Sequence, residues 1–275
     1  LVMRALLRQS YFWHGYGRPT IGARSDIEGA PFDALRAFHR THYRPDNAAL
    51  IVSGHFDPER VLALAGRLFS EGRNPQTDRR GNWTREDARH ITNRSELTLS
   101  TGKTMAASGW RLPAGTDRQT IAYDLASTAI CNGDWGSLRK QLVLEAQQAV
   151  SASCGVAGRP DYSLMVARAA AGKEADVDAL ARALSAHIES AAERGIDAEQ
   201  LERARAAELN AFERLETSHE RLASALSRAE TAGDWRLYFR HRDLIRDITL
   251  DEANQALRTW TVAGNRSDVI LRHAE

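Results

Sequence analysis

The sequence predicts an α+β protein built from two tandem halves, each a mixed or antiparallel sheet covered by helices, with the first half incomplete. Short apolar runs typical of buried strands alternate with amphipathic stretches typical of helices. A polar stretch without periodicity separates two such regions, and the helix-to-strand pattern of residues 34–52 recurs approximately at 251–271. We therefore divide the chain into the C-terminal part of a first half (1–75), a linker (76–95) and a second half (96–275).

The first half contains two predicted helices and one predicted strand. A helix over 31–43 carries Phe32, Leu35 and Phe38 on one face, and Pro45 prevents its continuation. The apolar run within 46–54 predicts a buried strand. Asp57 and Pro58 then provide a cap and a first helical residue, which predicts a helix reaching residue 72.

The second half reads as strands and helices in alternation. Strands are predicted at 97–99, 105–110, 149–156, 162–169 and 269–271, and helices at 121–130 and 137–147. An amphipathic helix with Val177 and Ile188 in its apolar stripe ends at Gly195. A longer helix extends from residue 197 to 226, and Thr249 and Glu252 have the spacing of a capping box before the last helix.

The amino-acid composition argues against some classes of function. The formal net charge is +1, from 37 basic and 36 acidic residues, which argues against a nucleic-acid or membrane-surface role. No apolar run is long enough to span a bilayer.

Only three of the basic residues are lysines, which favours a bacterial source with GC-rich coding, and the start at Leu1 suggests a truncated chain. Cys131 and Cys154 are interpreted as two unpaired buried thiols, with a single bridge as the alternative.

No complete catalytic or metal-binding constellation is found in the sequence. His39 and His42 lie three apart on a predicted helix, but no carboxylate at helical spacing supplies a third ligand, so we favour a packing role. The run 240–243 is interpreted as a charged surface, and Cys131 as a small buried residue rather than a nucleophile. We therefore predict no catalytic residue, no metal ligand and no cofactor within this chain.

A series of motifs resembles the insulinase/pitrilysin/mitochondrial-processing-peptidase family of zinc metallopeptidases. The resemblance covers nearly all 275 residues and is stronger as an ordered series than in any one piece. The segments that carry it are Gly-Arg-Pro-Thr-Ile-Gly at 17–22, the run 38–48, Gly-His-Phe-Asp-Pro at 54–58, Gly-Trp-Arg-Leu-Pro at 109–113, 138–142 and 195–201.

The resemblance implies metallopeptidase-type halves that face each other across a chamber holding an extended peptide. In this family zinc is bound by His-x-x-Glu-His and a distant glutamate, all upstream of the Gly-Arg-Pro segment and hence upstream of Leu1. An arginine and a tyrosine of the later half bind the peptide carbonyl, and the matching positions here are Val143 and Val150. Valine cannot donate a hydrogen bond, so this half should not supply the carbonyl clamp.

Three functional hypotheses follow. The first is the C-terminal region of a bacterial zinc metalloendopeptidase subunit, inactive alone, with zinc in the full-length protein and a homologous partner subunit or a second copy completing the site. The alternative is a catalytically dead family member acting as a scaffold or partner subunit. The third is a helix-rich interaction module. We expect an extended peptide substrate, no nucleic acid and no membrane span, and favour the bacterial periplasm over the cytoplasm.

Overall fold

A five-stranded mixed sheet forms the centre of this computed structural model, which describes residues 1–69, 84–88, 91–100, 102–133, 135–173 and 175–274. β1 and β5 run parallel, whereas β5–β2, β2–β4 and β4–β3 are antiparallel. The mixed sheet confirms the predicted α+β class. In spatial order the strands are β1 (Asn93–Leu99), β5 (Arg266–His273), β2 (Met105–Leu112), β4 (Ser163–Ala171) and β3 (Ala149–Ala157).

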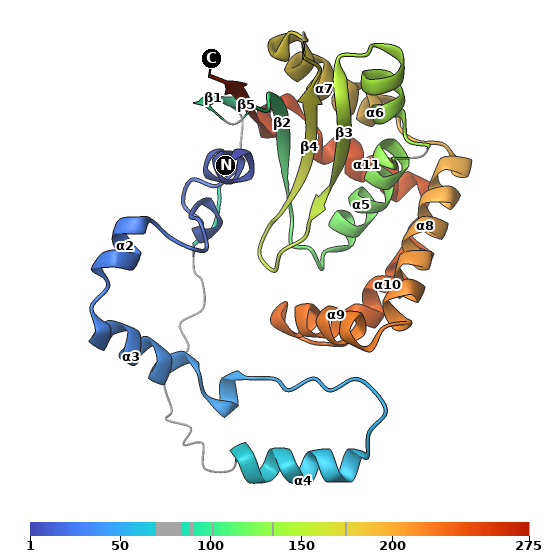
Figure 1. The fold of residues 1–275 in the computed structure, drawn as a ribbon. Coiled ribbons are helices and arrows are strands. Elements are labelled where there is room, and N and C mark those ends of the chain that lie inside the picture. The colour runs from blue at the N-terminus through green and yellow to red at the C-terminus, as the bar shows by residue number, and fades with distance from the viewer. Residues whose placement is uncertain (70–83, 89–90, 101, 134, 174, 275) are drawn as a thin grey trace.

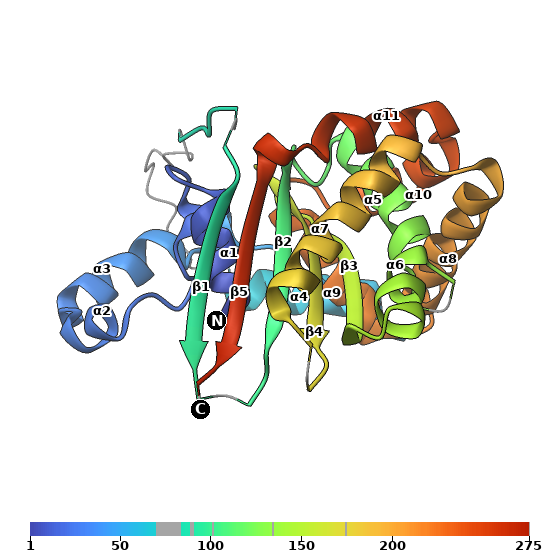
Figure 2. The ribbon, with the colours of Figure 1, turned by 90° about the horizontal axis from the view of Figure 1, so that it is seen from above.

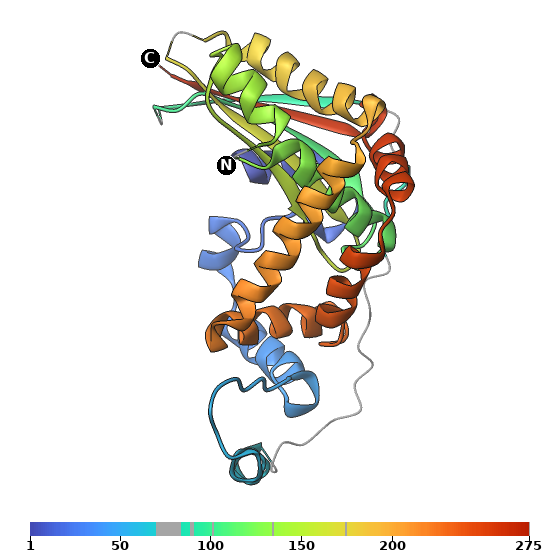
Figure 3. The same ribbon diagram turned by 90° about the vertical axis from the view of Figure 1, so that its right-hand side faces the viewer.

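Helices cover the two faces of the sheet unequally (Figures 2 and 3). The helices α5 (Arg118–Cys131), α7 (Val177–Arg194) and α11 (Leu250–Trp260) pack on one face, and the short helix α6 (Ser137–Arg139) contacts β3 on this side. Helix α1 (Val2–Ser10) lies against β5 and β2 on the opposite face. The central strands therefore bury side chains on both sides.

Successive residues of the central strands alternate between these two faces. Ile270 belongs to the large core beneath α5 and α7, while the preceding Val269 packs against Leu6 of α1. This alternation follows from the two-residue period of an extended strand. Gly109 allows the close approach of α1, because a Cβ atom there would lie 3.1 Å from Leu6 Cδ2.

A helical arm follows α7 and extends away from the sheet (Figure 1). It comprises α8 (Ala198–Glu216), α9 (His219–Thr231) and α10 (Leu237–Asp247). Arg205 on α8 fixes the end of α10, because its guanidinium donates to the carbonyl oxygens of Ile245, of Arg246 at 2.8 Å and of Ile248 at 2.8 Å. These carbonyls have no partner within the helix, so the arginine satisfies them.

The early segment, with α2 (Arg24–Gly29), α3 (Phe32–His42) and α4 (Pro58–Phe69), lies apart from the sheet (Figure 1). The two helices predicted there are confirmed as α3 and α4. The buried strand predicted at 46–54 is wrong: Pro45–Asn47 is a 3-10 turn, and Leu50 and Val52 are 62% and 42% exposed. A strand needs a neighbour to pair its backbone, and none of the described strands lies beside this segment.

Two further helix predictions need correction. The helix predicted from 197 to 226 breaks at 217–218, because the Ser218 side chain accepts from Arg221 N and caps a new helix, α9. The charged run 240–243, interpreted as surface, lies on α10, where Arg240 and Asp243 are exposed and His241 and Arg242 are half-buried. The helix predicted at 137–147 continues from α6 (Ser137–Arg139) as a π-helix, Lys140–Glu145.

The predicted helix caps form as the sequence indicates. Asp57 accepts from Glu59 N at 3.0 Å, and Asp197 with Gln200 forms a reciprocal capping box. Thr249 and Glu252 form a second such box. Capping depends on residues three apart, so it can be read from local sequence alone.

Cys131 and Cys154 form a disulfide that joins the end of α5 to β3. Their Cα atoms lie 5.4 Å apart, within the range of protein disulfides. The interpretation of two unpaired thiols is therefore wrong. Sequence could not decide the matter, because the pairing depends on how a helix end meets a strand 23 residues later.

Reduction of this disulfide should lower the free energy of unfolding by about 3 kcal/mol, because the unfolded chain regains the entropy of a loop of roughly this length. Urea denaturation followed by tryptophan fluorescence, with and without dithiothreitol, measures the change. The variant Cys131→Ala/Cys154→Ala is the control and should be insensitive to the reductant. Equal urea midpoints for the oxidised and reduced native chain would contradict the prediction.

Candidate functional site

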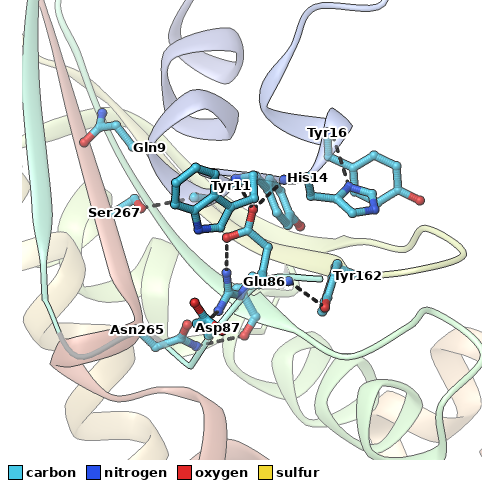
Figure 4. A network of polar contacts seen from close by, with 12 residues as sticks. Gln9, Tyr11, His14, Tyr16, Glu86, Asp87, Tyr162, Asn265 and Ser267 are labelled. Carbon is cyan, nitrogen blue, oxygen red and sulfur yellow. Dashed lines mark hydrogen bonds and ion pairs between the residues drawn. The ribbon is translucent and has the colours of Figure 1, made fainter. Parts of the chain in front are cut away.

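Three segments distant in sequence meet at the buried carboxylate of Glu86 (Figure 4). Its Oε1 accepts from the backbone N–H groups of Trp13 and His14, both at 2.7 Å. Its Oε2 pairs with Arg111 Nη1 of β2 at 3.0 Å, and Arg111 also donates to the carbonyl of Asp87. The Glu86 and Arg111 side chains are only 2% and 8% exposed, so the ion pair is a buried one.

The charge state of Glu86 follows from these partners. Burial alone would raise the pKa of its carboxyl group. The backbone N–H groups of His14, Trp13 and Phe12, together with Arg111, outweigh burial and hold the pKa of Glu86 below its usual range. Glu86 is therefore ionised at neutral pH and acts as a hydrogen-bond acceptor rather than as a proton donor.

An aromatic cluster surrounds this carboxylate (Figure 4). The Tyr11 hydroxyl donates to the carbonyl of Ser163 at 3.0 Å, and Glu86 N donates to the Tyr162 hydroxyl at 3.1 Å. His14 pairs with Asp161, with 3.3 Å between Nε2 and Oδ2, and its Nδ1 accepts from Tyr16 N. Burial raises the pKa of Tyr11, so its hydroxyl stays protonated.

This junction ties the N-terminal segment to β2, to β4 and to the turn before β4. The polar groups of Glu86, His14 and Tyr11 that face each other are engaged by protein partners, which leaves none of the three positioned as a base for an incoming water. The sequence analysis placed Glu86 in a linker. A residue that accepts hydrogen bonds from distant backbone N–H groups produces no periodic hydrophobic pattern in its own segment.

Each of the two histidines of α3 packs against an aromatic ring. His39 stacks on Tyr43 with ring centroids 4.8 Å apart, and His42 lies 4.3 Å from Phe38. Within the described residues, no group of three or more His, Cys, Asp or Glu side chains is placed to hold a metal ion. No helix in the described part of the chain is long and apolar enough to cross a membrane.

The two positions matched to the carbonyl clamp lie on different elements. Val143 is in the π-helix and is half-buried against the main core, whereas Val150 lies on β3 and is 67% exposed. Val150 sits where the β3–β4 register shifts, between Ala149 and Ser151, so it is the extra residue of a bulge. Neither side chain can donate a hydrogen bond.

The π-helix is held in place by a buried histidine of α7. His187 Nδ1 contacts Gln141 Oε1, and its Nε2 lies 2.9 Å from the Ser137 hydroxyl. Burial lowers the pKa of His187, which keeps the ring neutral and suited to one donated and one accepted hydrogen bond. π-helices often mark functional positions, but here both ring nitrogens serve the fold.

Asp124 of α5 is a second carboxyl group with an altered pKa. Dense packing around it, together with the nearby charge of Glu208, raises the pKa of Asp124 to about 7, although part of the residue stays exposed. Glu208 itself accepts from the Thr128 hydroxyl at 2.8 Å. An altered pKa alone does not define a catalytic group, and no metal-binding set of side chains occurs in the described residues.

With this geometry established, comparison with known proteins identifies the family. The sequence profile of the peptidase M16 inactive domain matches residues 30–208. The chain belongs to this family. The match confirms the resemblance to zinc metallopeptidases seen in the motifs.

Individual relatives agree with this assignment. The zinc protease PqqE of Helicobacter pylori is 24% identical over 136 residues, which are 49% of this chain and 31% of that protein. The chain thus spans about a third of the length of this curated relative. An inactive peptidase domain from Bordetella parapertussis is 29% identical, with a TM-score of 0.57 over 63% of this chain and 94% of its own.

The fold is shared over a longer span by a protease from Helicobacter pylori. Its TM-score is 0.90 at 18% identity, with 98% of this chain and 66% of that one covered. The first half of the periplasmic protease PqqL from Escherichia coli gives a TM-score of 0.76, also at 18% identity, with 98% of this chain and 60% of that one covered. The fold of the inactive-domain region is therefore that of M16-like peptidases.

Replacing Glu86 by alanine should lower the free energy of unfolding by about 3–5 kcal/mol, because Arg111 would remain as an unpaired buried charge. Urea denaturation measures this loss. The matched control is Glu28→Ala, which removes the exposed partner of Arg24 and should shift the urea midpoint little. Similar midpoints for the two variants would show that the buried ion pair does not fasten the junction.

Asp124 should make the protein less stable as pH rises. Between the ordinary carboxyl value of 3.8 and about 7, the folded protein keeps a proton that the unfolded chain releases, so the free energy of unfolding falls across this window. Asp124→Asn should flatten this part of the pH profile and unfold at higher urea than the native chain above pH 7. Parallel profiles for the two proteins, measured from urea midpoints, would exclude Asp124 as the cause.

Proposed function

We propose that this chain is the non-catalytic region of a zinc metalloendopeptidase subunit, forming part of the wall of a chamber that encloses an extended peptide and inactive alone. The match to the peptidase M16 inactive domain over residues 30–208 carries this proposal. Catalytic zinc sites use three protein ligands and an activated water. We expect zinc in the full-length protein, held by residues outside this chain.

The valines at 143 and 150 support a passive role. A carbonyl clamp needs donors aimed at the developing oxyanion, which valine lacks. We propose that the clamp comes from a homologous partner subunit or from a second copy. An extended peptide is the substrate class that fits such a chamber.

A bacterial periplasmic location fits two observations. The Cys131–Cys154 disulfide is the kind of bond that persists in oxidising compartments. The Escherichia coli relative of shared fold is described as a periplasmic protease. We therefore propose proteolysis in the bacterial periplasm as the setting of this function.

A scaffold role is the alternative. A chain of Complex III from Candida albicans shares the fold, with a TM-score of 0.81 at 13% identity and 99% of this chain covered. In that alternative the full-length protein would have no zinc site and no peptidase activity. Zinc content and peptide hydrolysis therefore separate the two functions.

The full-length gene product should contain about one zinc per chain and cleave extended peptides, since a catalytic site of this class needs a single zinc. Residues 1–275 alone should bind no stoichiometric zinc and cleave no peptide. Elemental analysis and a quenched fluorescent peptide provide the measurements, and removal of zinc by a chelator followed by its return is the control. A full-length protein that lacks both zinc and activity would leave the scaffold alternative.

The passive role of Val150 can be checked in the same full-length enzyme. Val150→Ala removes an exposed side chain, so folding should be unaffected. We expect kcat and KM to change by less than about twofold, since no transition-state contact is lost. A loss of kcat with KM unchanged would assign Val150 a part in catalysis.

A further inference from the structure

A cavity of about 790 Å³ lies between the helical arm and the end of the sheet at which β3 turns into β4. Its walls come from α5, α8, α9 and α10, from the loop before α5 and from the turn between β3 and β4, and Figure 1 shows where these elements lie. The volume is within the range of small-molecule sites. Its apolar walls include Ile121, Phe212, Leu215, Leu237 and Leu244.

Among the described residues that line this cavity, those that carry a charge are arginines, and Asp234, an acidic group close to Arg240, lies outside the lining. Arg159, Arg228 and Arg240 line it together with His241, and no Asp or Glu is among its described lining residues. Arg228 and Arg240 are exposed, so their guanidinium groups can contact a ligand at the rim of the cavity. This arrangement is complementary to a single negative charge at the entrance of an apolar space.

The lining also indicates which kind of anion fits. Most of the cavity wall is helical, and helical backbone groups are already hydrogen-bonded within their own helices. A peptide would bring many main-chain donors and acceptors into this space, and they would lack partners there. Thr231, one of the few hydroxyl groups available, already donates to the carbonyl of Ser227.

We propose that this cavity binds an acyl chain that ends in one carboxylate, with the chain between α8 and α10 and the carboxylate beside Arg228 and Arg240. A hydrocarbon tail needs no hydrogen-bond partner, so it suits walls of leucine, isoleucine, phenylalanine and alanine. His241 extends the apolar surface, since its ring packs 5.7 Å from Phe212. This site adjoins the junction at Glu86 only through Arg159, which lies over the Tyr16 ring, and it does not depend on the proposed peptidase role.

Calorimetric titration of the chain with dodecanoate, below its micelle concentration, tests the proposal. We expect saturable binding of one dodecanoate per chain, and binding of dodecanol and dodecyltrimethylammonium that is roughly tenfold weaker or more, because they lack the charge-assisted contact. Equal binding of dodecanol and dodecanoate would overturn the proposal. Tighter binding of a short apolar peptide with a free carboxyl terminus would also overturn it.

Three variants locate the site. Arg228→Gln/Arg240→Gln should weaken dodecanoate binding roughly tenfold, whereas Arg221→Gln, which changes an exposed arginine of α9 outside the lining, should leave it unchanged. Ala229→Trp should abolish binding by filling the space. Circular dichroism checks that each variant is folded, and folded variants that bind dodecanoate like the native chain would refute the assigned site.

Discussion

Burial of both faces of the central strands is the constraint on which the rest of this structure depends. On one face the strands meet α5, α7 and α11, and on the other they meet α1. The missing side chain of Gly109 lets Leu6 of α1 approach the sheet closely. Because α1 comes from the start of the chain, this face ties the N-terminal segment to the second half. The same N-terminal segment is also held just after α1. There the backbone of Trp13 donates to Glu86, which is paired with Arg111.

Local features of the structure were accessible from sequence, and long-range ones were not. The caps at Asp197 and Thr249 depend on residues three apart, so the starts of their helices were predicted correctly, whereas the end of the first was not. The segment 46–54 has the composition of a strand but lacks a pairing partner among the described strands, which no local pattern reveals. The role of Glu86 was not predicted for the same reason. The backbone N–H groups that donate to it belong to residues more than 70 positions away.

The membership in the peptidase M16 inactive domain family gives these features a common interpretation. Several side chains inside this domain make contacts that stabilise the fold. His187 serves the π-helix, Glu86 serves the junction and Val143 packs against the core. The buried polar groups of His187 and Glu86 are hydrogen-bonded in this way, which stabilises the fold.

The bulge at Val150 has a consequence for how the sheet can grow. β3 is an edge strand of the described sheet, and backbone groups along a sheet edge can pair with a further strand from another molecule. An added strand needs evenly spaced donors and acceptors, and the register shift between Ala149 and Ser151 disturbs that spacing at the start of β3. Strand addition along the whole of this edge is therefore disfavoured, which protects an exposed β-edge from fibre-like self-association.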